Sequence, residues 1–348
     1  MRNSVIESDL QFIVEADLPW ERLKNKTVLI SGAAGFLPAY MVETLLHLNE
    51  TRNYNITVYG LVRDRERALV RFARYRDNSS LKLIVQDVCD KVAIRGDVDF
   101  IVHAASQATP KTFLANPVGT LSPNVIGTDQ LLKLAAEKHV ECFLFFSTSG
   151  VHGHVSPDSF PIKEDCVGTL DFKDIASCYL ESKRMGENMC QAWLHQHGVP
   201  AKIVRPATTY GPGLKLDDGR SFADFIANVV NFKDIEIYSD GKATRNFCYL
   251  ADATVGFFTV MLKGKTGEAY HIATDHEISI LDLANLLVQK VFPERNLKVV
   301  MKADPAKDYL RINYPRTAVD ISKARALGWT LHFPVEAGFR RTVESFGD

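Results

Sequence analysis

TVLISGAAGFLP, residues 27–38, combines an apolar strand, a glycine-rich turn and the start of a helix. Residues 27–30 are aliphatic or β-branched, which predicts a short buried strand. Gly32 and Gly35 form the turn that follows it. In a strand–turn–helix unit, glycines let the backbone approach a pyrophosphate, whose charge the helix N-terminus stabilises. The segment therefore predicts a phosphate-binding turn.

The same alternation of apolar strands with helices continues along the chain as far as Pro206. Helices separate further strands, which are expected at residues 57–62, 81–85, 100–102, 142–146 and 201–204. Continuous apolar strands of this kind favour a parallel, doubly wound sheet. We predict an α/β fold with a Rossmann-like cofactor-binding domain over 24–206 and a smaller C-terminal substrate-binding lobe over 207–348. Residues 1–23 are an N-terminal extension, and residues 249–262 are expected to pass back to the first domain.

Composition and charge narrow the classes of function. The 348 residues carry a formal net charge of −1 with both signs interspersed, so neither a nucleic-acid partner nor a membrane partner is expected. The six cysteines show no C-x-x-C spacing, and we expect reduced thiols and no metal site. The N-terminal residues lack the apolar stretch of a signal peptide, which favours a cytoplasmic location.

A second motif, Tyr179-x-x-x-Lys183, follows the glycine turn by about 150 residues. Residues four apart lie on one face of a helix, so the lysine ammonium is expected to lower the pKa of the phenol. A tyrosine tuned in this way can take or return a hydroxyl proton while a nicotinamide cofactor carries the hydride. The alternative is an ordinary surface pair, and the other motifs along the chain argue against it.

The end of the second strand bears on the type of cofactor. A dinucleotide without a 2′-phosphate usually meets an acid there, whereas a 2′-phosphate meets an arginine. This chain has Arg63 followed by Asp64, so NADP with Arg63 on its phosphate is preferred over NAD. In the alternative, Arg63 stacks on the adenine and Asp64 or a backbone group binds the ribose. Asp87, after the third strand, is placed to accept from the adenine amino group or to cap the next turn.

In this order, the motifs resemble those of the extended short-chain dehydrogenase/reductase family, in its nucleotide-sugar epimerase/dehydratase branch. The resemblance runs from about residue 23 to residue 338, and it rests on Gly32/Gly35, Asp87, His103-Ala104-Ala105, Asn124, Ser147-Thr148-Ser149, Tyr179/Lys183 and Arg205-Pro206. Two later segments also match the branch: GKATRNF at 241–247, and VDISKA at 319–324 with LGW at 327–329.

The resemblance implies a catalytic group of five residues. Tyr179 is the acid/base, and Lys183 lowers its pKa and binds the nicotinamide ribose. Thr148 hydrogen-bonds the reacting sugar oxygen, and Ser149 is the neighbouring candidate for this role. Asn124 supports the group or, in the alternative, only caps a helix.

The resemblance also implies the ligand contacts. The cofactor is expected to contact Gly32, Ala34, Gly35, Phe36, Leu37, Arg63, Asp87, Val88, Ala104, Ala105, Ser106, Tyr179, Lys183 and Arg205. The substrate, a nucleotide-diphosphate sugar, is expected to contact Thr208, Arg245 and Arg316, with Arg311 as an alternative to Arg316.

One departure from the branch limits the chemistry. Its dehydratases and decarboxylases typically carry a Glu in S/T-x-E-V-Y-G and use it as a second acid/base. Here residues 148–153 read TSGVHG, so Gly150 offers no side chain for that work. Elimination of water is therefore disfavoured, while hydride transfer at a sugar C4 still has its Ser/Thr, Tyr and Lys. His152 as a substitute base is less favoured than His152 as a buried packing residue.

Four hypotheses about function follow from these motifs. The preferred one is an NADPH-dependent 4-keto-sugar reductase, and the first alternative is a 4-epimerase that retains NAD. A UDP-glucuronate decarboxylase or a 4,6-dehydratase comes third because of Gly150. A non-catalytic NADP-binding sensor comes last, since such relatives usually lose the Tyr/Lys pair. The resemblance further implies a homodimer, formed through the helices that carry Asn124 and Tyr179.

Overall fold

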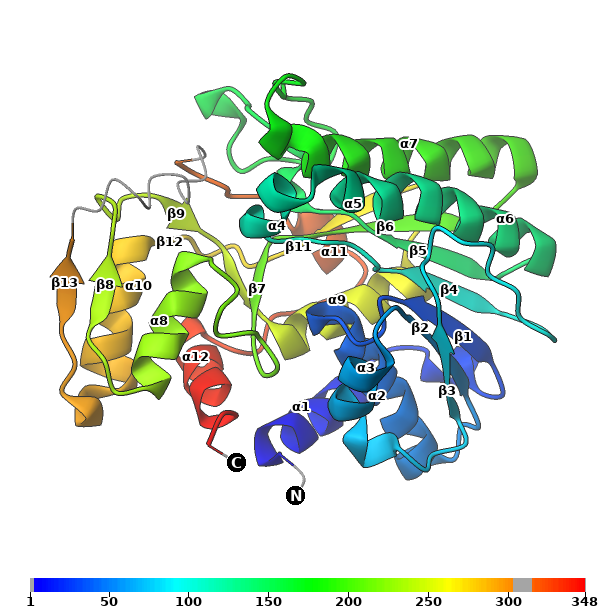
Figure 1. Cartoon of the computed structure of the whole chain (residues 1–348), viewed down its shortest axis with the longest axis horizontal. Coiled ribbons are helices and arrows are strands. Elements are labelled where there is room, and N and C mark those ends of the chain that lie inside the picture. The colour runs from blue at the N-terminus through cyan, green and yellow to red at the C-terminus, as the bar shows by residue number, and fades with distance from the viewer. Residues whose placement is uncertain (1–2, 303–314, 348) are drawn as a thin grey trace.

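A seven-stranded parallel sheet forms the centre of the fold (Figure 1). In the computed structural model, which describes residues 3–302 and 315–347, its strands are β1 (Thr27–Ser31), β2 (Thr57–Val62), β3 (Leu81–Val85), β4 (Phe100–His103), β5 (Cys142–Phe146), β6 (Ala201–Pro206) and β11 (Ala269–Ile272). Their order is β3-β2-β1-β4-β5-β6-β11, and neighbouring strands are parallel. This confirms the predicted doubly wound, Rossmann-like α/β fold.

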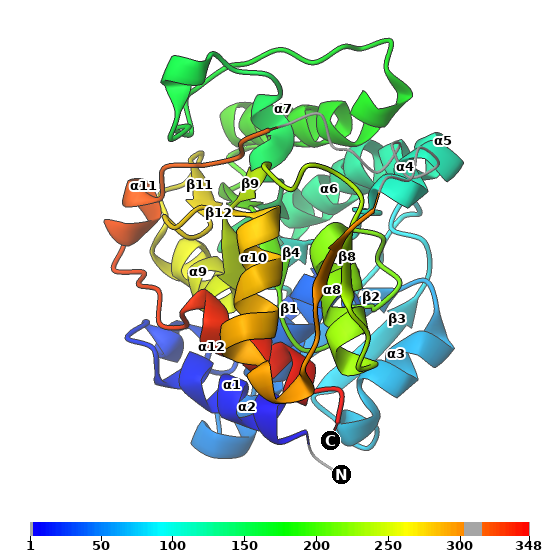
Figure 2. The same ribbon diagram turned by 90° about the vertical axis from the view of Figure 1, so that its left-hand side faces the viewer.

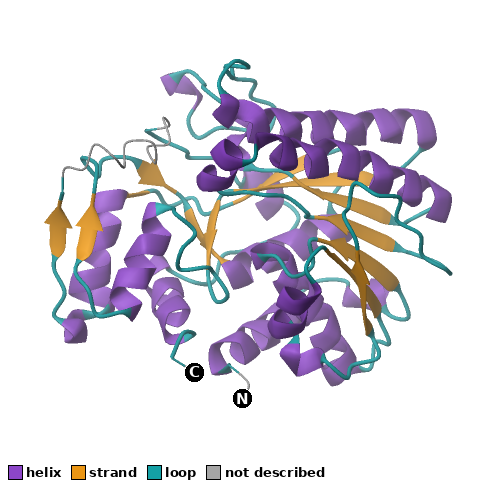
Figure 3. Cartoon of the chain, in the orientation of Figure 1, coloured by secondary structure: helices purple, strands orange, loops and turns teal. Residues whose placement is uncertain are grey.

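Helices cover both faces of the sheet (Figure 3). One face carries α4 (Pro110–Ala115), α5 (Pro117–Ser122), a π-helical turn (Pro123–Gly127), α6 (Thr128–Lys138) and α7 (Cys178–His197). The other face carries α1 (Ser4–Glu15), α2 (Phe36–Arg52), α3 (Arg65–Arg71), α9 (Leu250–Lys263) and α11 (Ser322–Arg325). The strands feed two separate cores: Leu29 packs on the α6 and α7 side, while Val28 and Ile30 pack on the α2 side. No helix within the described ranges is long and apolar enough to cross a membrane.

The strand ends gather the predicted motifs at one edge of the sheet. Ser31 at the end of β1 pairs with His103 at the end of β4, and His103 pairs with Phe145 near the end of β5. The loops after these three strands therefore emerge side by side. This carboxyl edge is where open α/β sheets bind their ligands.

A smaller lobe lies beyond that edge (Figure 2). Its elements are β7 (Thr208–Tyr210), α8 (Ser221–Val230), β8 (Ile235–Ile237), β9 (Thr244–Arg245), β10 (Phe247–Tyr249), β12 (Ile278–Ser279), α10 (Ile280–Leu286), β13 (Val299–Met301) and α12 (Val335–Glu344). Three two-stranded pairings, β7 with β10, β9 with β12 and β8 with β13, tie these short elements together. Helix α8 is buried through its apolar face, which includes Phe222, Phe225 and Ile226.

The chain returns to the main sheet after β10. Helix α9 is buried along almost its whole length, and β11 then pairs with β6 as the seventh strand. The polypeptide crosses back once more when Val319 forms a bridge to Ile162. The predicted domain boundary at residue 206, with residues 249–262 as the returning segment, stays a prediction. The structure adds two further returns to the first domain, at β11 and at Val319.

The N-terminal segment is anchored to both parts of the chain. The side chains of Ile13 and Val14 are buried in the core that α2 and α9 share, and Leu10 is buried as well. The Asn3 side chain donates to the carbonyl of Ser345 at 2.8 Å, so the two ends of the described chain lie together (Figures 1 and 2).

Candidate active site

The glycine turn after β1 lies against the loop after β4. Gly32 has a φ of +67°, and a Cβ at this position would lie 2.8 Å from the Cα of Ala105. The Ser31 hydroxyl joins the two loops, because it accepts hydrogen bonds from the N–H groups of Ala104 and Ala105 at 3.2 Å. Gly35 is the N-cap of α2 and brings no capping side chain, which leaves the first helical N–H groups open to an anion. These features fit the pyrophosphate of a dinucleotide.

Arg63 and Asp87 lie together where β2 and β3 end. The guanidinium is 3.9 Å from the carboxylate, and both side chains are exposed. Asp87 also accepts a hydrogen bond from the N–H of Cys89, which holds the pKa of its carboxyl below the usual range. Asp64 caps α3 by accepting from the N–H of Arg67. The arginine expected at a 2′-phosphate is therefore paired with an acid.

The remaining residues predicted around the cofactor are spread over the turn, the core and the β4 loop. Ala34, Phe36 and Leu37 are half-buried at the glycine turn. Val88 is buried in the core on the α6 side. The Ser106 hydroxyl is buried and has no hydrogen-bond partner among residues 3–302 and 315–347. An unpaired buried hydroxyl beside the turn is a further feature that fits a bound ligand.

Tyr179 and Lys183 lie on the first turns of α7, facing the end of β5. The Thr148 hydroxyl lies close enough to Tyr179 to oppose the rise in its pKa, and the Phe113 ring stacks on the tyrosine ring at a centroid distance of 4.6 Å. Lys183 is buried, and its ammonium donates to the carbonyl of Phe146 at 2.6 Å. The same ammonium is 5.9 Å from the centroid of the Tyr179 ring. The structure thus brings Tyr179, Thr148 and Lys183, the residues predicted to take part in proton transfer, into one group.

The electrostatics of this group differ from the expectation that Lys183 acidifies Tyr179. Burial raises the pKa of Tyr179 to about 12, and the opposing effects come from Thr148 and from the charge of Arg220. Burial lowers the pKa of Lys183 to about 7, opposed by the charge of Glu187. Desolvation outweighs the Lys–Tyr attraction here, because the ammonium is directed at a backbone carbonyl and not at the phenol.

Asn124 lies on the π-helical turn that precedes α6 and is fully buried. Its amide donates to the carbonyl of Thr120 at 3.0 Å and to the hydroxyl of Ser182 at 2.9 Å. The amide oxygen has no partner in the described part of the chain, and neither does the buried hydroxyl of Ser147. Asn124 therefore connects the π-helical turn to α7, the helix of Tyr179, and keeps one acceptor available. A π-helical turn is itself frequent at functional sites.

Arg205 takes part in a buried polar cluster. Its guanidinium donates to both carboxylate oxygens of Glu187, at 2.9 and 2.7 Å, and to the carbonyl of Glu164 at 2.6 Å. Beside it, the Nε2 atoms of His152 and His271 are 2.8 Å apart. Burial lowers the pKa of both imidazoles, that of His271 to about 3. The donors of Arg205 are engaged inside the protein, and its contact with the cofactor stays a prediction.

The residues predicted to bind substrate lie on the other side of the carboxyl edge. Thr208 is half-buried in β7. Arg245 donates to a neighbouring backbone carbonyl, burial lowers its pKa, and the described residues place no carboxylate on its guanidinium. Arg316 instead bonds both carboxylate oxygens of Glu277 at 2.6 to 3.1 Å. Arg311 lies outside the described residues. A half-buried guanidinium without an acid suits a diphosphate.

Sequence reasoning missed three residues of this site. Phe113 covers the ring of Tyr179 but belongs to no motif, so nothing in the sequence indicated its position. Ser182 is the residue before Lys183, and its place one turn after Tyr179 was a usable signal. Arg220 affects the pKa of Tyr179 although it lies in the second lobe, next to its ion-pair partner Asp218.

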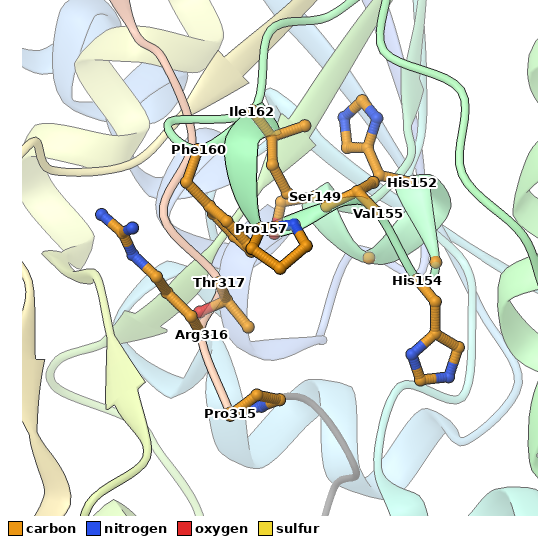
Figure 4. Close-up of a pocket in the computed structure, with 12 residues that line it drawn as sticks. Ser149, His152, His154, Val155, Pro157, Phe160, Ile162, Pro315, Arg316 and Thr317 are labelled. Carbon is orange, nitrogen blue, oxygen red and sulfur yellow. The ribbon is translucent and has the colours of Figure 1, made fainter.

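A cavity of about 290 Å³ opens at Ser149 and Gly150, which follow Thr148 in the chain (Figure 4). Ser149 and Gly150 line it, and a Cβ on Gly150 would lie 3.6 Å from the Oγ1 of Thr148. The far wall comes from residues 315–317, which follow the segment that the structure leaves undescribed. Gly150, at the position where the family motif is expected to carry a Glu, therefore brings no side chain to this cavity.

Comparison with known proteins places the chain in a family. The model of the NAD dependent epimerase/dehydratase family matches residues 28–273. UDP-glucuronic acid decarboxylase 3 of Arabidopsis thaliana is 32% identical over 323 residues, covering 92% of this chain and 89% of the relative. UDP-glucuronic acid decarboxylase 1 of Xenopus tropicalis is 30% identical over 326 residues, covering 92% and 72%.

Solved structures agree on the fold. An epimerase of Methanothermobacter thermautotrophicus aligns with a TM-score of 0.80 at 20% identity, covering 100% of this chain and 96% of that one. The UDP-glucuronic acid 4-epimerase of Bacillus cereus, in complex with UDP-glucuronic acid and NAD, aligns with a TM-score of 0.76 at 22% identity, covering 92% and 99%. By its sequence match and its fold, the chain belongs to the NAD dependent epimerase/dehydratase family and is an enzyme of that family.

Proposed function

We propose that this enzyme moves a hydride between a nicotinamide cofactor and C4 of a UDP-linked sugar, in a cycle that retains the cofactor. The observation that carries the proposal is the group of Tyr179, Thr148 and Lys183 at the carboxyl edge of the sheet, which also bears the glycine turn. The names of the curated relatives support a UDP-linked substrate.

Each residue of the group has a part in the proton transfer. Thr148 orients the sugar oxygen, because a hydroxyl can donate to a ketone and accept from an alcohol. Tyr179 removes the proton when the alcohol is oxidised and returns it when the ketone is reduced. The cofactor, when bound at the glycine turn, supplies the hydride acceptor. Arg245 pairs with the diphosphate of the substrate, for which its guanidinium is available.

The net reaction that needs these residues and no others is 4-epimerisation. A second candidate, decarboxylation of UDP-glucuronate, is favoured by the names of the curated relatives. Gly150 does not exclude it, because CO2 that leaves C5 of a 4-keto hexuronate passes its electron pair into the C4 enolate, so no base is required. A proton from water then enters at C5, and hydride returns to the C4 ketone. Dehydration does require a base at C5 and stays disfavoured. The relatives thus support the decarboxylase alternative over the ketoreductase that the sequence had placed first.

NAD is the proposed cofactor in place of NADP. The ground for NADP was Arg63, and the Asp87 carboxylate lies 3.9 Å from its guanidinium. That carboxylate would repel a 2′-phosphate bound to Arg63. Titration of the protein with NAD and NADP measures the preference directly, and Asp87→Asn is expected to improve the binding of NADP more than that of NAD.

A homodimer is part of the proposal. Large apolar side chains are exposed on the helices of one sheet face, at Leu114, Val118, Ile126 and Met185. Such side chains on neighbouring helices suit a contact between subunits. Light scattering of the purified protein tests this, and a monomer at micromolar concentration would contradict it.

The main test offers the purified enzyme UDP-glucose, UDP-galactose and UDP-glucuronate with NAD. Nuclear magnetic resonance identifies the carbon that changes, and mass spectrometry detects loss of CO2. Interconversion at C4 without net NADH supports epimerisation, and a UDP-pentose supports decarboxylation. The proposal fails if no substrate changes at C4 and none loses CO2, or if Tyr179→Phe turns over as fast as the unchanged enzyme.

A further inference from the structure

The cavity at Ser149 lies where it could contact the substituent on the ring carbon next to the reacting carbon. It begins at Ser149 and Gly150, and a Cβ at Gly150 would be 3.6 Å from the Thr148 hydroxyl that is to hold the reacting oxygen. Substituents on adjacent ring carbons project from neighbouring points of the ring. A group on the carbon beside the reacting one would therefore lie near the mouth of this cavity if Thr148 held the oxygen.

Glycine at position 150 keeps that mouth open. A Cβ there would lie 2.8 Å from the Cδ2 of Leu180, closer than carbon atoms normally approach. Leu180 thus occupies the space that a larger residue would need. Gly150 itself brings neither an acid nor a base to the opening.

The walls of the cavity are mostly apolar (Figure 4). The residues that contribute them are Val155, Pro157, Phe160, Ile162 and Pro315. Ser149 and Thr317 add one hydroxyl each. Such a lining accommodates a methyl or hydroxymethyl group, while it offers a carboxylate little compensation for its lost hydration.

Two of the basic side chains that the described residues place at the cavity, Arg316 and His152, have partners within the protein. The Arg316 guanidinium bonds both oxygens of Glu277 and stacks over the Phe160 ring, and in Figure 4 its side chain extends away from Pro157. Both ring nitrogens of His152 have partners, Nδ1 at the carbonyl of Cys166 and Nε2 at His271. Burial keeps the pKa of His152 below its usual value, so its ring is neutral near pH 7. His154 also lines the cavity, and its ring lies at the opposite end of the group from Arg316.

We propose that this cavity receives an uncharged substituent, methyl or hydroxymethyl, on the ring carbon next to the reacting carbon. The enzyme accordingly discriminates against a hexuronate, which separates it from the decarboxylases that it resembles. This inference rests on the proposed function and decides between its two candidate reactions.

The test is a comparison of binding, which does not depend on turnover. The dissociation constants of UDP, UDP-6-deoxyglucose, UDP-glucose and UDP-glucuronate are measured by calorimetry with NAD present. The two uncharged sugars are expected to bind about tenfold or more tightly than the glucuronate, the scale on which one group in an apolar pocket discriminates. If UDP-glucuronate binds as tightly as the uncharged sugars or more tightly, the inference is overturned. The proposed class of substrate still stands in that case, provided that UDP itself binds. Failure of all four ligands to bind overturns the proposed function itself.

A pair of variants tests the charge argument separately. Thr317→Arg places a cation in the cavity and is expected to improve UDP-glucuronate binding about tenfold relative to UDP-glucose. Thr317→Gln, a long side chain without charge, is the matched control and should give no such gain. Equal effects of the two variants would show that the cavity does not contact the substituent. Melting curves of both variants establish that they fold. If either variant does not fold, the dissociation constants measured on the unchanged enzyme still test the inference.

Discussion

Two buried polar clusters of this protein differ in how completely the chain satisfies them. In the first, Asp9 is 0% exposed and accepts from Tyr40 at 3.0 Å, from Tyr249 at 2.7 Å and from Arg341 at 2.5 Å. In the second, at the candidate active site, the side-chain oxygens of Ser106, Asn124 and Ser147 are buried without a partner in the described part of the chain.

The difference separates stability from function. The Asp9 cluster joins α1, α2, β10 and α12, and its hydrogen bonds hold the N-terminal segment to both parts of the chain. The active-site cluster leaves polar atoms unpaired, which opposes folding but keeps them available to a ligand. Substitutions in the first should therefore change stability and substitutions in the second should change turnover.

The strongest test of this separation is Tyr179→Phe. Removing the hydroxyl deletes the proton donor and acceptor, so kcat is expected to fall about a thousandfold. The free energy of unfolding should change by less than about 1 kcal/mol, because among the described residues Thr148 is the side chain whose hydrogen bonding affects this hydroxyl. Steady-state rates and urea titrations measure the two quantities.

Tyr40→Phe is the matched control for that experiment. It removes the same atom from the Asp9 cluster, where the hydroxyl of Tyr40 donates at 3.0 Å. We expect a loss of about 1 kcal/mol in unfolding free energy and an unchanged kcat. If Tyr179→Phe destabilised the fold more than Tyr40→Phe did, the two clusters would not differ in the way described.

Asp9→Ala should destabilise the protein most strongly. It leaves Arg341 without its carboxylate and two buried tyrosine hydroxyls without their acceptor, for an expected loss of about 3 kcal/mol. Asp9→Asn retains an acceptor oxygen and should lose less. Below the melting transition kcat/KM should match that of the unchanged enzyme. A large fall in kcat/KM with stability intact would instead assign the cluster a part in positioning the second lobe.

The elements that the sequence predicted are those with local signals. The strands at residues 27–31, 57–62, 100–103 and 142–146 are apolar runs in the sequence, and Gly32 marks the turn after the first of them. The order of these elements could therefore be predicted without knowledge of tertiary contacts. Strand β11 was not predicted, because Ala269–Ile272 includes a histidine and its place beside β6 depends on the long α9 that precedes it.

At the site, residue identity was easier to predict than electrostatics. The spacing of Tyr179 and Lys183 indicated one helix face, and the structure has both on α7. The direction of the Lys183 ammonium, toward the carbonyl of Phe146, depends on how α7 packs on β5, which no local pattern reports. The ion pair of Arg205 with Glu187 has the same origin, since it joins a strand to a helix.

The pH dependence of turnover sharpens the comparison further. Because burial lowers the pKa of Lys183 to about 7, its ammonium is charged below pH 7 and loses that charge as the pH rises. If the charge assists the reaction, kcat/KM, which reports the free enzyme, falls above pH 7. Lys183→Arg keeps a cation and should move this fall to higher pH. Lys183→Met should lower kcat/KM about a hundredfold below pH 7. A profile that is flat across pH 7 in the unchanged enzyme would contradict the role of the charge.

Phe113→Ala is expected to have the smallest effect on turnover. It tests whether the Phe113 ring excludes water from the Tyr179 hydroxyl. The Phe113 ring stacks on Tyr179 at 4.6 Å, and burial is the largest cause of the raised pKa of about 12. Admitting water should lower that pKa by about one unit toward its reference of about 10. The phenolate needed for alcohol oxidation then forms at lower pH. In the pH profile of the oxidation rate, the rising limb therefore moves to lower pH by the same amount, about one unit. Leu114→Ala, on the exposed side of the same helix, is the control and should leave the limb in place. An unshifted limb in Phe113→Ala would mean that β5 and α7 alone exclude water from the phenol, and that α4 takes no part in tuning it.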